Sequence, residues 1–142
     1  MNTPTHFDQL LRAASEQPDP QQLLFVFAAA ELPDDATPAQ RRRFAAGGGG
    51  SLAPLMCVAK GPGELAGFDA FVAESRDAGP AWQVVFAAGL AGSFGRAPTE
   101  PQVELALQAM VERVRAGVFD GLLALDPAGQ PLSFSPSAGA PN

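Results

Sequence analysis

The most constraining feature of the sequence is an uninterrupted apolar run, Leu23 to Ala30, that ends in an acidic segment containing a proline. A strand with one face in water alternates apolar and polar residues, so a run without alternation predicts a strand covered on both faces. Such strands are typical of a sheet that lies between layers of helices. We therefore expect this segment to be the central strand of the fold.

Three further segments have the character of strands. The residues from Trp82 to Leu90 are almost as apolar as the first run, which predicts a second inner strand. The segment from Leu52 to Ala59 contains Pro54, which cannot donate a backbone hydrogen bond, so this strand is expected at a sheet edge or to begin only after the proline. A short strand is predicted from Leu122 to Leu125, followed by a turn and a returning hairpin strand that ends at Phe134.

Helices are predicted between these strands. Thr5, Thr37 and Thr99 each have the character of a helix N-cap, and the last two are followed by proline and then glutamine. Apolar residues between Leu65 and Ser75 recur at helical spacing, which predicts a further helix that is ended by Gly79 and Pro80.

The alternation of strands and helices predicts the α/β class. Each connection is longer than the dozen or so residues that a crossover needs, which favours a parallel sheet. We expect one small three-layer domain over residues 1–134. Its sheet would have four mostly parallel strands and an antiparallel C-terminal hairpin strand, in the flavodoxin-like order 2-1-3-4-5. The alternative is a two-layer sheet with helices on one face only, and residues 135–142 are expected to form a flexible tail.

Composition excludes several classes of function. The formal net charge of −6 disfavours binding to nucleic acid or to an anionic membrane surface. The single cysteine, Cys57, leaves no partner for an internal disulfide or a redox pair, and its position in an apolar strand favours a buried, inert thiol. No basic region followed by an apolar segment opens the chain, so a cytoplasmic location is expected.

A parallel sheet would place a candidate ligand site at the carboxyl ends of its first and third strands. The residues expected to line this crevice are Glu31, Asp34, Asp35, Lys60, Ser93, Phe94 and Arg96.

Motifs that would specify a chemistry are weak. The glycines between Gly89 and Arg96 could admit a phosphate group, but the segment lacks the ending of a P-loop, and a flexible connection is favoured. Glu31, Asp34 and Asp35 are read as a solvated turn in preference to a metal site. No catalytic residue, metal or cofactor is predicted.

The segments from Leu23 to Pro38 and from Pro54 to Val58 resemble a family of small proteobacterial proteins whose members are sometimes labelled ribonucleotide reductase subunit alpha. The resemblance extends from Phe7 to Phe134, and no functional motif is attached to it. The label does not fit as an activity, because a reductase of that class needs a radical cysteine and a redox pair, whereas this chain has Cys57 alone.

These observations predict a non-catalytic protein-interaction or regulatory module that binds a protein partner or a second copy of itself. The apolar residues Phe94 and Leu105, which lie outside the predicted buried stripes, support this hypothesis. The alternative is an enzyme or binding protein that holds a small, for example phosphate-containing, ligand in the crevice between the first and third strands.

Overall fold

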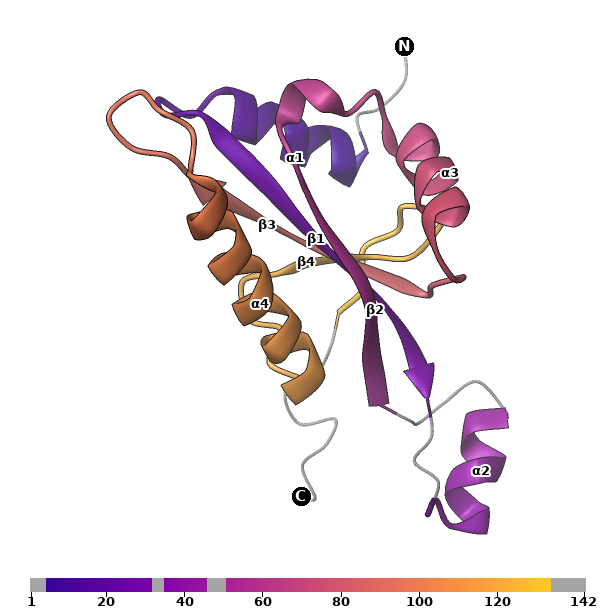
Figure 1. The fold of residues 1–142 in the computed structure, drawn as a ribbon. Helices are drawn as coiled ribbons and strands as arrows, with labels where there is room; N and C mark the ends of the chain where they lie inside the picture. The colour runs from indigo at the N-terminus through magenta and orange to yellow at the C-terminus, as the bar shows by residue number, and fades with distance from the viewer. Residues whose placement is uncertain (1–4, 32–34, 46–50, 134–142) are drawn as a thin grey trace.

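The computed structural model describes residues 5–31, 35–45 and 51–133. In chain order it contains the elements α1 (His6–Ser15), β1 (Gln21–Glu31), α2 (Pro38–Ala45), β2 (Ser51–Lys60), the short 3-10 helix η1 (Pro62–Glu64), α3 (Phe68–Ala78), β3 (Val84–Ala91), α4 (Glu100–Ala116) and β4 (Leu123–Leu125). The strands form a sheet in the order β2-β1-β3-β4 (Figure 1). The predicted tail, 135–142, lies outside the described residues.

Every pair of neighbouring strands is antiparallel, so the prediction of a mostly parallel, flavodoxin-like sheet is wrong. Val26 in β1 lies opposite Cys57 in β2 and Phe86 in β3, and both of these strands run against β1. In place of the predicted fifth strand, the described chain after β4 makes a single bridge, between Leu125 and Pro131.

The error has a physical cause. An uninterrupted apolar run reports burial on both faces and carries no information on the direction of the neighbouring strands. A connection long enough for a crossover also permits an antiparallel return. The β1–β2 connection contains α2, which lies beyond the ends of these strands and covers neither face of the sheet (Figure 1). Only α3 links two strands of the same direction, β2 and β3, and β1 lies between them.

Helices cover both faces of the sheet, as expected for a three-layer domain. On one face α1 and α3 pack over a cluster that includes Phe25 and Phe27 of β1, and on the other α4 packs over Leu24 and Val26 (Figure 1). Every side chain of β1 from Leu23 to Ala28 is buried. The prediction that this run is a doubly covered inner strand is confirmed.

The face beneath α1 and α3 is largely aromatic. Phe71 of α3 lies at the centre of this cluster, with its ring centroid 4.5 Å from that of Phe25, 5.2 Å from that of Phe7 and 5.4 Å from that of Phe27. Trp82, just before β3, meets Phe27 edge-on at 5.1 Å. Ring pairs at these separations add to the free energy gained by burying their area, so this cluster fixes α1 and α3 on the sheet.

The three predicted threonine N-caps are confirmed, whereas the helix predicted from Leu65 begins at Phe68. Thr5 and Thr99 each form a capping box with the residue three positions later, and Thr37 exchanges the same pair of hydrogen bonds with Gln40. These contacts satisfy backbone N–H groups that the first turn of a helix leaves without partners.

Candidate functional site

The outer edge of β2 is a free edge of the sheet. Within the described residues, β2 pairs with β1 on one side and with no strand on the other. Pro54 lies in this edge strand, as its missing N–H group predicts. Opposite it the pairing register shifts between Phe27 and Ala28, so Leu55 is the extra residue of a β-bulge.

Backbone hydrogen bonds of β1 show which groups of β2 point outward. The Ala30 N–H donates to the Gln83 side chain at 2.6 Å, and the Ala28 carbonyl accepts from the Gln83 N–H at 2.9 Å. Even-numbered residues of β1 therefore direct their backbone groups toward β3, and odd-numbered residues direct theirs toward β2. In β2, the partners of odd-numbered residues are Met56, Val58 and Lys60, which are opposite Phe27, Phe25 and Leu23.

It follows that the intervening residues of β2, Cys57 and Ala59, point their N–H and C=O groups away from the sheet. An edge of this kind can accept the backbone of another extended segment.

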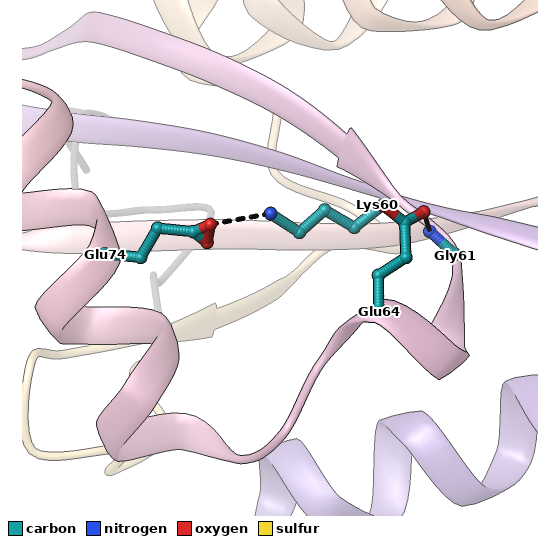
Figure 2. Close-up of polar contacts among 4 residues, drawn as sticks. All are labelled: Lys60, Gly61, Glu64 and Glu74. Atoms are coloured by element: carbon teal, nitrogen blue, oxygen red, sulfur yellow. Dashed lines mark hydrogen bonds and ion pairs between the residues drawn. The ribbon is translucent and has the colours of Figure 1, made fainter.

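A hollow of about 330 Å³ lies between this edge and α3. Its apolar wall is formed by Phe27, Met56, Val58, Phe71 and Ala78. At one end Lys60 Nζ is 2.8 Å from Glu74 Oε1, so this cation and this carboxylate neutralise one another (Figure 2). Glu64, labelled in the same figure, instead accepts the Gly61 N–H at 2.7 Å and closes the turn after β2.

The opposite face of the edge, beside α4, is lined by both apolar and acidic side chains, and Leu107 and Val111 supply apolar surface there. Cys57 shares one hollow of about 560 Å³ with Glu104, Gln108 and the Glu112–Arg115 ion pair. A neighbouring hollow of about 620 Å³ is lined by the residues Gln22, Ala59, Pro98, Glu100, Val103 and Glu104. Carboxylates therefore outnumber cations along this side of β2.

Cys57 contributes to the lining of a hollow on each side of the edge and is exposed. The interpretation of this thiol as buried is wrong, because β2 has no outer neighbour strand within the described residues to cover it. The apolar strand pattern did not distinguish a side chain inside the sheet from one at its rim.

The predicted crevice residues do not meet at one place. Glu31 ends β1, whereas Ser93, Phe94 and Arg96 follow β3. In an antiparallel pair these two ends are at opposite ends of the sheet, and Gln21, at the start of β1, lies opposite Ala91. Ten residues of extended chain separate Gln21 from Glu31, which is about 33 Å.

The other predicted residues are divided in the same way. Lys60 pairs with Leu23 near the start of β1 and bonds to Glu74, while Asp35 is exposed beyond the far end of β1. Asp34 lies outside the described residues. The structure therefore assembles no common pocket from the described members of this set.

The turn after β3 is tight. Ser93 and Arg96 exchange two backbone hydrogen bonds of 3.0 Å, and Phe94 and Gly95 between them have φ values of 53° and 75°. Positive φ at both central positions defines a type I′ turn, in which a bulky residue such as phenylalanine is strained. Asp19 accepts the Gly95 N–H at 2.8 Å, so this amide is already engaged and does not face a free phosphate site.

Two large apolar side chains stand out from the surface. Phe94 is 97% exposed at the tip of this turn, and Leu105 is 68% exposed on α4. The prediction that both residues lie outside the buried stripes is confirmed.

Within residues 5–31, 35–45 and 51–133 there is no group of three or more His, Cys, Asp or Glu side chains placed to hold a metal ion. In the same described residues, no helix is both long and apolar enough to cross a membrane.

Comparisons with protein-family models, curated proteins and solved structures found no match.

Proposed function

We propose that this chain is a non-catalytic protein-interaction module that binds an extended polypeptide segment along the free edge of β2. The observation that carries the proposal is the outward-facing backbone of Cys57 and Ala59, with a hollow on either face of the strand. In strand addition, main-chain hydrogen bonds supply affinity, and pockets for alternate side chains supply specificity.

One half of the β2 edge lacks the usual protection, which supports this role. Soluble proteins commonly place a charged side chain or a proline along an exposed edge strand to prevent pairing with other chains. In β2 the stretch from Met56 to Ala59 carries no charge. Lys60 lies at the end of that stretch and is bonded to Glu74. Pro54 and the bulge at Leu55 protect only the other half of the strand.

The exposed apolar residues outside the edge are consistent with an interaction module. Phe94 and Leu105 each present apolar surface to water. Single exposed apolar side chains are common in proteins, so the edge of β2 and not these residues defines the proposed site.

A photo-crosslinking experiment tests the proposal. A benzophenone amino acid replaces Leu55, which is 37% exposed beside the edge, and the full chain is exposed to an extract of the cells that express it. Crosslinked peptides are mapped by mass spectrometry. Cys57→Pro removes one outward N–H group, and Cys57→Ser is the matched control that keeps it.

We expect the chain with benzophenone at position 55 to crosslink a polypeptide at β2, both with Cys57 unchanged and with Cys57→Ser. With Cys57→Pro, the yield of the crosslinked product should be at least tenfold lower. Circular dichroism establishes that the proline variant is folded. Equal yields from the two folded variants, or no crosslink from a chain that light scattering shows to be a strict monomer, would overturn the proposal.

A further inference from the structure

The two faces of the β2 edge differ in chemistry, and an added strand would meet both. Successive side chains of a strand point to opposite faces of the sheet. One set of alternate side chains would therefore enter the hollow beside α3, and the other set would lie along α4.

The hollow beside α3 favours apolar side chains. The rings of Phe27 and Phe71 and the side chains of Met56 and Val58 form its wall, and its one lysine is paired with Glu74. An apolar residue placed here removes surface from water without leaving a charge unpaired.

The face beside α4 combines the apolar side chains of Leu107 and Val111 with carboxylates that can attract cations. Glu104 lines both hollows on this side, and Glu100 lines the second. Within the described residues, the ion pairs are Lys60–Glu74 and Arg115–Glu112, so neither Glu100 nor Glu104 is neutralised by one. A lysine or arginine of an added strand could approach these carboxylates.

We infer that the segment bound at β2 is an extended stretch of another protein in which apolar residues alternate with lysine or arginine. The apolar side chains enter the hollow beside α3, and the basic side chains lie against Glu100 and Glu104 on α4. This inference rests on the proposed function and adds the chemistry of the partner to it.

Charge also argues against a second copy of the chain as the occupant. A two-fold axis perpendicular to the sheet, which pairs two β2 edges antiparallel, would place α4 of both copies on the same face of the joined sheet. The strand of the second copy would present Cys57 and Ala59 to this face, and neither is a cation. The added strand would then bring no basic side chain to Glu100 and Glu104 of either copy, in a chain whose formal net charge is already −6.

Synthetic peptides test the inference directly. Three short, acetylated and fluorescently labelled peptides alternate valine with lysine, valine with glutamate, and serine with lysine. Binding to the full chain is measured by fluorescence anisotropy at low and high salt. Amide hydrogen exchange at Cys57 and Ala59 reports whether a peptide is bound at the edge.

We expect the valine–lysine peptide to bind at least tenfold more tightly than either of the other two and to slow exchange at both amides. Glu104→Gln should weaken this binding about two- to fivefold, the range typical of an exposed ion pair, and added salt should reduce the difference. Glu16→Gln is the matched control, because this substitution removes the same charge. Glu16 is an exposed carboxylate at the end of α1.

Equal binding of the valine–lysine and valine–glutamate peptides, with edge protection by both, would overturn the inference and leave the proposed function standing. Equal weakening by Glu104→Gln and Glu16→Gln would overturn it as well, because the attraction would then come from net charge alone. A concentration-dependent dimer with slowed exchange at Cys57 and Ala59 would identify a second copy as the occupant. If no peptide protects the edge and the crosslinks map elsewhere, both proposals fail.

Discussion

The indole nitrogen of Trp82 donates a hydrogen bond of 2.8 Å to the hydroxyl oxygen of Ser75. That hydroxyl in turn donates to the Val72 carbonyl at 2.6 Å, so the two side chains join α3 to the segment that leads into β3. Both residues are buried. A polar pair in an apolar core is stable only while each group keeps its partner.

Ser75→Ala should therefore lower the free energy of unfolding by about 1–3 kcal/mol, because the Trp82 N–H would be left buried without an acceptor. Urea unfolding followed by fluorescence measures this change, and Trp82 is the one tryptophan in the chain. The control is Ser15→Ala, since Ser15 is exposed and its hydroxyl bonds only to the Leu11 carbonyl. Equal effects of the two substitutions would contradict the role assigned to Ser75.

Phe7→Ala should destabilise the domain by about 3–5 kcal/mol, the usual range for removing a buried aromatic ring. Phe7 is 1% exposed and contacts the rings of Phe25, Phe68 and Phe71. Leu105→Ala, which truncates a residue on the surface of α4, should change stability by less than about 0.5 kcal/mol. The same urea titration compares the two, and a small effect at Phe7 would show that α1 is not anchored by this ring.

Phe94→Asn should stabilise the chain by about 1 kcal/mol, because asparagine tolerates positive φ and Asn-Gly is the preferred pair for a type I′ turn. Phe94→Ala is the informative comparison. It removes the exposed ring but keeps the strained backbone, so it should leave the thermal midpoint nearly unchanged. Scanning calorimetry of both variants distinguishes relief of strain from loss of the ring.

Cys57 should react with a thiol reagent such as Ellman's reagent in the folded protein, without denaturant, because its side chain is exposed at the sheet edge. The absorbance of the released thiolate follows the reaction. A rate that rises only when urea unfolds the chain would place the thiol inside the protein. Protection of Cys57 by a bound valine–lysine peptide would locate that peptide at the same edge.

Apolar runs, the proline in β2 and the threonine caps predicted the strands and helices well. Leu23 to Ala28 are buried on both faces as the apolar run indicated, Pro54 lies in an edge strand, and the threonine caps begin their helices. Each of these features depends on neighbouring residues or on the burial of a single strand. The sequence contains enough information to assign them.

Strand direction and the site could not be predicted in the same way. Direction depends on how α2, α3 and α4 return the chain, and the apolar pattern of β1 is the same in a parallel or an antiparallel sheet. The predicted crevice depended on that direction, so Glu31 and Arg96 were assigned to one pocket although they lie at opposite ends of the sheet. The hollows beside Cys57 are formed by α3 and α4, which are distant from it in sequence.

The bulge at Leu55 limits the footprint of any segment that joins the sheet. Regular pairing is available only from Met56 to Lys60, a length of about 17 Å. Within this stretch, Cys57 and Ala59 each offer one backbone donor and one backbone acceptor to an added strand. A typical main-chain hydrogen bond contributes only about 0.5–1.5 kcal/mol net. So short a contact favours reversible association, in which the side chains of the incoming segment decide whether it is retained.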